Sequence, residues 1–219
     1  MAAARKSNAQ PRKKGGAPQS AHRRATPVQR RSEETFTRIL DSSMQLLEEA
    51  GLGGFNTNAV AKAAGVNIGT LYHYFPDKTA LLAEMFVRSE SRRVEYFSSR
   101  VADLEFAHDL REWVNDTVGA LMKMRSATPG ATALRNAIRV VPELLDLGVQ
   151  QDARSASALA VAIRTRYPHV TKARAEAVSQ LIMDSGVAAL DRVGAGAGNA
   201  RTVQRELTEM VTAYLSSLE

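Results

Sequence analysis

Residues 57–76, TNAVAKAAGVNIGTLYHYFP, have the pattern of two short helices joined by a tight turn. Such helices can cross closely only if the first presents a small side chain and the turn holds a residue that tolerates a positive φ. Ala61 and Gly65 meet these two requirements. The helices also have an apolar underside at helical spacing, formed by Val60, Ala64, Val66, Leu71 and Tyr74. The segment therefore predicts a helix-turn-helix motif.

Six residues of this segment are left facing outward: Asn67, Ile68, Gly69, Thr70, Tyr72 and His73. Asn67 can cap the second helix. An exposed helical glycine costs ~1 kcal/mol relative to alanine, so Gly69 favours the close approach of a binding partner. Tyr72 and Tyr74 are two residues apart and so point to different faces, Tyr72 outward and Tyr74 to the core. The motif thus has one face for the core and one for a partner.

The rest of the chain also has helical spacing of apolar residues, and runs of β-branched residues are scarce. We expect an all-α fold of about nine helices, at residues 33–50, 58–64, 68–75, 77–99, 106–126, 131–139, 143–166, 171–193 and 201–217. Ser32 is the candidate N-cap of the first helix, and Gly51 the residue that ends it. This division predicts a three-helix helix-turn-helix domain at residues 32–77 and a larger helical domain at residues 78–219.

Positive charge is concentrated at the start of the chain. Residues 1–32 contain nine Lys or Arg and no acid, whereas residues 33–82 contain three basic and six acidic residues. The first 31 residues also have almost nothing to bury. They are therefore predicted to form a disordered basic arm.

Several classes of protein are disfavoured by what the sequence lacks. There is no cysteine, which excludes disulfides, thiolate metal sites and cysteine nucleophiles. The four histidines are too scattered to indicate a metal site, so no metal or other cofactor is expected, and no constellation of catalytic residues suggests an enzyme. The longest apolar run, residues 158–163, is too short to span a membrane, and no signal peptide is apparent. We expect a cytoplasmic protein with no membrane segment.

Residues 33–82 resemble the DNA-binding domain of the TetR family of transcriptional regulators. The resemblance is carried by Phe55, Thr57, Val60, Ala61, Ala64-Gly65-Val66, Gly69-Thr70-Leu71-Tyr72, Tyr74-Phe75, Lys78 and Leu81. It implies a homodimer that binds a near-palindromic operator in double-stranded DNA, with the second short helix in the major groove. It also implies contacts to the DNA backbone by Thr57, Tyr72 and Lys78. The positions that would face the groove are Asn67, Ile68, Gly69, Thr70 and His73.

Two sets of apolar residues in the C-terminal domain have two interpretations each. Met and aromatic residues could line a cavity for a small apolar or amphipathic ligand, or could be ordinary core; they are Phe86, Phe97, Trp113, Leu121, Met122 and Met124. Residues of the last two helices could be buried within the chain or could meet a second copy; they are Val178, Leu181, Ile182, Ser185, Ala189, Leu207, Val211 and Tyr214. The resemblance favours a dimer interface, because the last two helices of the family usually build a four-helix interface.

The leading hypothesis is a repressor that a small-molecule ligand releases from its operator. A two-fold dimer places two recognition helices in successive major grooves, roughly 34 Å apart, so a ligand that changes this separation misaligns at least one of them. The alternative is an architectural protein that senses no ligand and bridges DNA with its basic arm. That alternative predicts little discrimination among sequences, which competition with random duplex would measure.

Deleting residues 1–32 is expected to flatten the dependence of log K on log salt and to leave the operator preference unchanged. The counts above give residues 33–82 a net charge of −3, so the arm must supply most of the counterion release. Titrations of an operator duplex at several salt concentrations measure the slope. An unchanged slope would refute this role of the arm.

Overall fold

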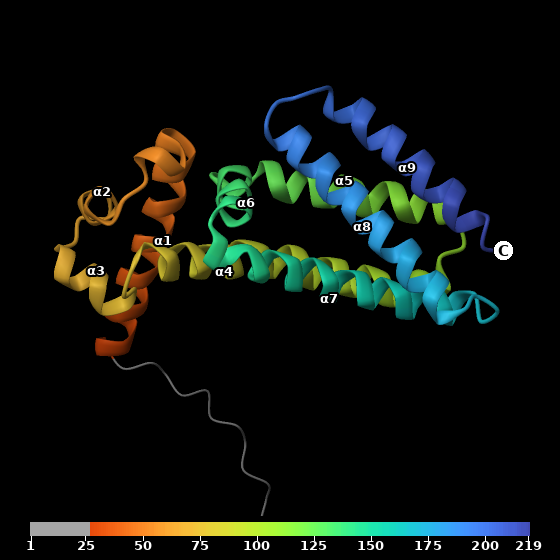
Figure 1. Ribbon diagram of the computed structural model, residues 1–219, viewed down its shortest axis with the longest axis horizontal. Helices are drawn as coiled ribbons and strands as arrows, with labels where there is room; N and C mark the ends of the chain where they lie inside the picture. Colours follow the sequence, from red (N-terminus) through yellow and green to blue (C-terminus); the bar gives the residue numbers. More distant parts are fainter. Residues whose placement is uncertain (1–26) are drawn as a thin grey trace, which may run out of the picture.

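The computed structural model describes residues 27–219, and within them it consists of helices and their connections, with no strand (Figure 1). The nine α-helices of this part are α1 (Pro27–Gly54), α2 (Thr57–Ala63), α3 (Ile68–Tyr74), α4 (Lys78–Ala102), α5 (Leu110–Ser126), α6 (Ala131–Val140), α7 (Pro142–Arg166), α8 (Lys172–Gly194) and α9 (Ala200–Ser216), with a 3-10 turn at Leu104–Phe106. The expected all-α fold is confirmed. None of the helices in residues 27–219 combines the length and the apolar character needed to cross a lipid bilayer.

α1 begins at Pro27 rather than just after Ser32, so the prediction of Ser32 as its N-cap was wrong. Proline is well suited to a first helical turn, because its missing N–H is not needed there. Arg30 Nε lies 3.3 Å from Glu34 Oε1 one turn further along, and such a pair supports an exposed helical start. Residues 27–31 are therefore helical and do not belong to a disordered arm. The remainder of the predicted arm lies outside the described residues.

Two further helix ends are set by single residues. Gly51 has φ of 61° and ψ of −176°, which is not helical, so the predicted end of the first helical run is visible as a kink inside α1. The helix expected from residue 106 begins only at Leu110, because Asp109 caps it by accepting a hydrogen bond from the backbone N–H of Glu112. Both features leave the order of the helices as expected.

The N-terminal core joins α1, α2 and α3 to the start of α4. Fully buried side chains come from each of these helices, among them Ile39, Leu47, Val60, Leu71 and Leu81. The same core takes in side chains of two later helices, Leu134 and Ile138 of α6 and Leu144 of α7. The boundary expected at residue 77 therefore does not separate two hydrophobic cores, since the first core extends across it.

The second core lies among α5, α7, α8, α9 and the C-terminal half of α4. In Figure 1, α1 to α3 form one end of the molecule, and α4 runs from them alongside α7 toward the opposite end. There α8 packs on α7 and α9 packs on α5. α4 thus contributes side chains to both cores and connects them.

Candidate nucleic-acid interface and ligand cavity

The turn between α2 and α3 has the geometry that the sequence predicted. Gly65 has φ of 63°, and Ala61 is buried. The backbone N–H of Val66 donates to the carbonyl of Ala61 at 3.0 Å. Asn67 Oδ1 accepts a hydrogen bond from the N–H of Thr70 at 2.6 Å, so Asn67 caps α3 as predicted. These local bonds fix how α3 leaves the turn.

The edge of α3 opposite the core is open to solvent. Ile68 is 37% exposed and Tyr72 48% exposed, whereas Leu71 is fully buried beneath them. The other outward positions are exposed or, in the case of Thr70, half-buried: Asn67, Gly69, Thr70 and His73. All six residues predicted to face outward are therefore accessible from outside the chain.

Gly69 has a reason within the chain for lacking a side chain. A Cβ built at this position would lie 3.3 Å from Asn67 Oδ1, the oxygen that caps α3. This distance is shorter than an ordinary carbon–oxygen contact, so alanine would press on the cap. The sequence alone suggested only the close approach of a partner.

The three positions expected to contact the DNA backbone lie in two places. Thr57 Oγ1 and Tyr72 Oη are 3.1 Å apart, which ties the start of α2 to the exposed edge of α3. Lys78 is half-buried, and its Nζ donates to the carbonyl of Leu52 at 3.3 Å and lies 5.6 Å from the centre of the Phe55 ring. The structure therefore brings Thr57 and Tyr72 together and holds Lys78 against the end of α1.

Neither α2 nor α3 contains an acidic residue. The nearest acid that follows α3 in the chain is Asp77, whose carboxylate caps α4 by accepting a hydrogen bond from the N–H of Ala80 at 2.7 Å. The excess of acid in residues 33–82 is thus carried by other elements. The two helices of the motif have no carboxylate of their own to repel a polyanion.

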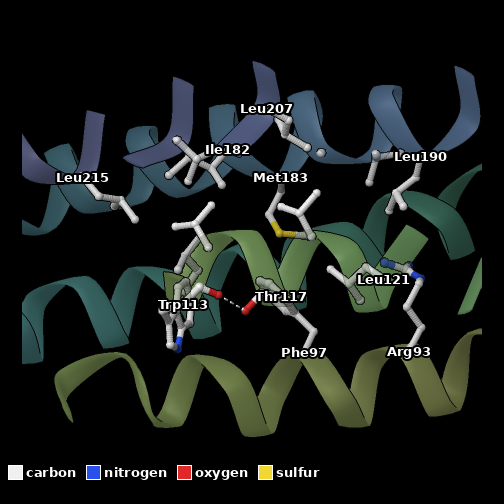
Figure 2. Close-up of a pocket in the computed structure, with 16 residues that line it drawn as sticks. Arg93, Phe97, Trp113, Thr117, Leu121, Ile182, Met183, Leu190, Leu207 and Leu215 are labelled. Carbon is white, nitrogen blue, oxygen red and sulfur yellow. Dashed lines mark hydrogen bonds between the residues drawn. The ribbon is translucent and has the colours of Figure 1, made fainter. Parts of the chain in front are cut away.

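An apolar cavity of about 70 Å³ lies among α4, α5, α7, α8 and α9 (Figure 2). Of the residues predicted to bind a ligand, Phe97, Trp113 and Leu121 line it. Figure 2 shows Trp113 toward one end of the row of lining side chains and Arg93 toward the other. Sequence reasoning missed Arg93, because an arginine within a helix gives no apolar signal.

The other three predicted ligand residues do not line this cavity. Phe86 belongs to the N-terminal core, where its ring lies 5.7 Å from the guanidinium of Arg135. Met122 is buried in the second core beside the cavity-lining Leu121, but adjacent helical residues point to different faces. Met124 lines a separate polar cavity between α4 and α5.

The residues predicted for a dimer interface divide into inward and outward groups. Val178, Leu207 and Val211 are buried in the chain's own core, and Leu207 and Val211 line the apolar cavity together with Ile182. Val178, Leu207 and Val211 therefore face the chain's own core, and Ile182 is half-buried, so the contact of these four with a second copy stays a prediction. The outward group consists of Leu181, which is 57% exposed, Tyr214, which is 39% exposed, and the half-buried Ser185 and Ala189. Met210, 49% exposed, is an addition from the same face of α9 as Tyr214.

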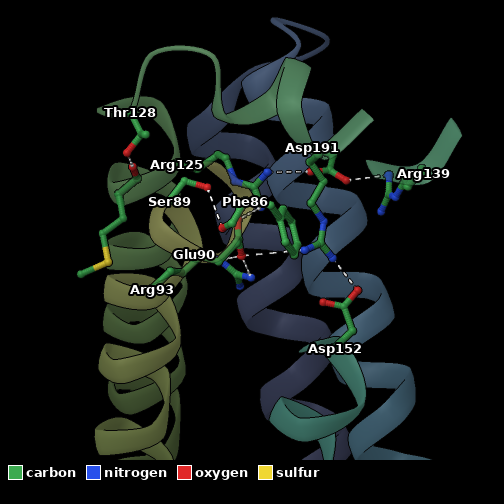
Figure 3. Close-up of polar contacts among 11 residues, drawn as sticks. Phe86, Ser89, Glu90, Arg93, Arg125, Thr128, Arg139, Asp152 and Asp191 are labelled. Carbon is green, nitrogen blue, oxygen red and sulfur yellow. Dashed lines mark hydrogen bonds and ion pairs between the residues drawn. The ribbon is translucent and has the colours of Figure 1, made fainter. Parts of the chain in front are cut away.

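A buried group of charged side chains, which we call the charged cluster, joins α4, α5, α6, α7 and α8 (Figure 3). Glu90 of α4 is at its centre and is only 5% exposed. It accepts a hydrogen bond from Arg93 Nε at 2.7 Å. Arg125 Nη2 and Arg135 Nη1 each lie 3.8 Å from its carboxylate. One carboxylate therefore faces three buried guanidinium groups.

Two further acids complete the charged cluster. Asp191 accepts from Arg125 Nη1 at 3.1 Å and pairs with Arg139 Nη1 at 2.7 Å, while Asp152 pairs with Arg135. Burial lowers the pKa of the Arg125 guanidinium, although Glu90 opposes this shift. Burial also acts to lower the pKa of Arg135, but the hydrogen bond and charge of Asp152, together with the charges of Glu90 and Asp191, outweigh burial, and the pKa is raised. Asp152 thus stabilises the charged form of Arg135.

The sequence contained a signal for this cluster. Leu82, Phe86 and Phe97 lie on one apolar stripe of α4, and Glu90 and Arg93 occupy the positions between them at helical spacing. Charged residues on a buried stripe need partners from neighbouring helices. The partners themselves are distant in sequence and could not be assigned from the spacing.

The connection from α5 to α6 is fastened to α1 at Gly130. The N–H of Gly130 donates to Glu48 Oε2 at 2.6 Å, and its φ is 70°. A Cβ at this position would lie 2.4 Å from the backbone oxygen of Met44. The start of α6 therefore lies directly against α1, which itself packs on α2.

Together these features define a class of protein: a helix-turn-helix protein whose exposed α3 is attached to a larger helical domain with an apolar cavity. A family model described as "Bacterial regulatory proteins, tetR family" matches residues 39–85, and one described as "Tetracyclin repressor-like, C-terminal domain" matches residues 109–215. The chain belongs to the TetR family of bacterial regulatory proteins. The family consists of regulators and not of enzymes.

Related proteins match the chain over about a third of its length. The HTH-type transcriptional regulator UidR of Escherichia coli K12 is 28% identical over 79 residues, which are 36% of this chain and 40% of UidR. The HTH-type transcriptional repressor KstR of Rhodococcus jostii is 40% identical over 60 residues, 27% of this chain and 28% of KstR. The chain thus matches less than half the length of these relatives.

Solved structures share the fold over most of the chain. The fatty acid degradation regulator FadR of Bacillus halodurans has a TM-score of 0.63 at 19% identity, covering 81% of this chain and 97% of FadR. A TetR-like transcriptional regulator from Rhodococcus sp. RHA1 has the same TM-score at 18% identity, covering 83% of this chain and 96% of its own. The similarity of fold therefore covers more than four fifths of the chain, although sequence identity is below 20%.

Proposed function

We propose that the protein is a homodimeric repressor of transcription, which acts in the cytoplasm and is released from a palindromic DNA operator by a small-molecule ligand. The observation that carries the proposal is the exposed edge of α3, where Thr70 and His73 are accessible above the buried Leu71. A short helix supported in this way can enter the major groove. Repression is the action named for KstR, and it is proposed for this chain by analogy.

The route from ligand to DNA would pass through α4 and α6. α4 lines the apolar cavity with Phe97 and contributes Leu81 to the N-terminal core. α6 contributes to that same core and touches α1 at Gly130. A ligand can shift the dimer between two arrangements only by its difference in affinity for them, and a shift from 99:1 to 1:99 requires about 5.5 kcal/mol.

Replacing Thr70 or His73 with alanine is expected to lower the preference for operator over random duplex by about 1–3 kcal/mol per substitution. The reason is that each side chain would contribute hydrogen bonds to base edges, while contacts to phosphates would remain. Competition binding of a selected operator against random duplex measures the preference. Thr165→Ala is the matched control, because Thr165 is exposed on α7 and bonds only a carbonyl of its own helix. If all variants kept the same preference for operator over random duplex, the proposal that α3 contacts the bases would be contradicted. If the native protein bound all duplexes with equal affinity, the architectural alternative would be supported.

Replacing Leu181 with glutamate is expected to convert the dimer to a monomer. Leu181, Met210 and Tyr214 are the large exposed apolar side chains of α8 and α9. Burying a carboxylate between two copies would cost several kcal/mol. Sedimentation analysis gives the mass in solution, and Val161→Glu, at a 67% exposed position of α7, serves as the control. A Leu181→Glu variant that stays dimeric while remaining folded would place the interface elsewhere.

A further inference from the structure

Two cavities share Arg93 as part of their walls. The apolar cavity is lined by apolar residues except for Arg93 and Thr117. The hydroxyl of Thr117 is already engaged, since it donates to the carbonyl of Trp113 at 2.7 Å and accepts from Arg100 Nε at 3.1 Å. Arg93 is thus the single charged side chain on the wall of the apolar cavity.

The second cavity, of about 350 Å³, is polar and lies between α4, α5 and the connection to α6. Its charged lining consists of one acid, Glu90, and four cationic side chains, Arg92, Arg93, Lys123 and Arg125. Leu121 of the apolar cavity and Arg125 of the polar cavity are one helical turn apart on α5. The two cavities therefore adjoin, and one of them is strongly cationic.

Of the two buried arginines that line the polar cavity, Arg93 and Arg125, one has a hydrogen-bond donor without an acceptor in the described part of the chain. The side chain of Arg125 is 2% exposed, and its Nη2 makes no hydrogen bond within the described residues. Glu90 accepts hydrogen bonds from both Nε and Nη2 of Arg93, and its other oxygen lies 3.8 Å from Arg125 Nη2. A buried donor without an acceptor is costly, and an anionic acceptor satisfies it best.

We propose that the ligand of this protein is an amphipathic anion, with its apolar body in the apolar cavity and a carboxylate or phosphate hydrogen-bonded by Arg93 and Arg125 in the polar cavity. A neutral ligand would leave the Nη2 donor of Arg125 unsatisfied, and a cation would be repelled by the four basic side chains. The small size of the apolar cavity favours a short body. The regulatory consequence of this binding rests on the proposed function, whereas the site rests on the cavities alone.

Trp113 provides a direct readout, because it is the chain's only tryptophan and lines the apolar cavity. Its fluorescence would be followed during titration with hexanoate, hexyl phosphate, hexanol and hexylamine, with no DNA present. At least one of the two anions is expected to bind at least tenfold more tightly than hexanol, and hexylamine is expected to bind most weakly. The better of hexanoate and hexyl phosphate identifies the head group. Hexanol that binds as tightly as both anions would overturn the proposal.

The substitution Arg125→Gln tests the proposed site for the anionic head group, and it leaves each buried acid with another basic partner. Asp191 retains Arg139 as a partner, and Glu90 retains Arg93. The variant is therefore expected to fold, which thermal denaturation checks, and to lose the preference for the anion over hexanol. Arg164→Gln, at an exposed arginine of α7 that lines neither cavity, is expected to keep it. A folded Arg125→Gln protein that still preferred the anion over hexanol would also overturn the proposal. If the variant does not fold, the comparison of the four probes in the native protein still tests the proposal.

Addition of the same probes to the operator complex separates this inference from the proposed function. An anion that binds beside Trp113 but does not release DNA would contradict ligand release and support the ligand class. Operator-specific binding by a protein whose Trp113 responds to neither anion would overturn the ligand class alone.

Discussion

Replacing Glu90 with glutamine is expected to lower the free energy of unfolding by about 3–5 kcal/mol, because it breaks a buried ion network from one side. Glutamine has nearly the same size, so the change removes charge and little else. Arg93, Arg125 and Arg135 would then face one another without the carboxylate that they share. Urea denaturation followed by circular dichroism measures the loss.

Glu95→Gln is the matched control, since Glu95 lies on the same helix and is exposed. It is expected to change the free energy of unfolding by about 0.5 kcal/mol or less. Adding Arg125→Met to Glu90→Gln should recover part of the stability, because one of the repelling cations is then gone. A loss for Glu90→Gln as small as that for Glu95→Gln would show that the cluster does not depend on its central carboxylate.

Gly130→Ala is expected to destabilise the protein by about 2–5 kcal/mol. A non-glycine residue at φ of 70° costs about 1–2 kcal/mol. Overpacking adds about 1–3 kcal/mol, because the new Cβ would lie 2.4 Å from the backbone oxygen of Met44, which cannot rotate away. For a protein of this size, each 1 kcal/mol lowers the midpoint of thermal unfolding by about 2–4 °C. Thermal denaturation is the measurement.

Gly53→Ala separates this clash from a general effect of alanine. Gly53 lies in α1, has no positive φ, and a Cβ there would meet no atom within 4 Å. We expect Gly53→Ala to be as stable as the native protein or slightly more so. The operator affinity of Gly130→Ala should also fall, because the bond between the Gly130 N–H and Glu48 holds α6 against α1. If Gly130→Ala and Gly53→Ala had the same midpoint of thermal unfolding, the space at Gly130 would be large enough for a Cβ, contrary to this prediction.

The helix order and the helix-turn-helix motif could be predicted because they depend on local chemistry. Gly65 at positive φ and the Asn67 cap each act within a few residues of the chain. The start of α1 was missed for a local reason as well. Ser32 has the chemistry of an N-cap, but its hydroxyl bonds to Tyr74, and Pro27 begins the helix instead.

The inner and outer faces of the C-terminal helices could not be predicted, because they depend on which helices meet. α4 passes from one core to the other, so Phe86 and Phe97 lie on one helix and line different cores. α9 is apolar over a wide arc, and spacing alone does not tell that Leu207 points into the chain and Tyr214 away from it. The charged cluster draws on five helices, which no local pattern reveals.

The participation of Leu134, Ile138 and Leu144 in the N-terminal core limits how this protein can be engineered. The first three helices cannot be exchanged between relatives as an independent unit, because part of their hydrophobic core comes from residues more than fifty positions further along the chain. In a chimaera joined after α3, the first three helices would come from one parent and the α6 and α7 side chains that pack beneath them from the other. The new operator preference would then be combined with a core whose side chains do not fit together. A functional graft would have to transfer the start of α4, α6 and the first turn of α7 together with α1 to α3.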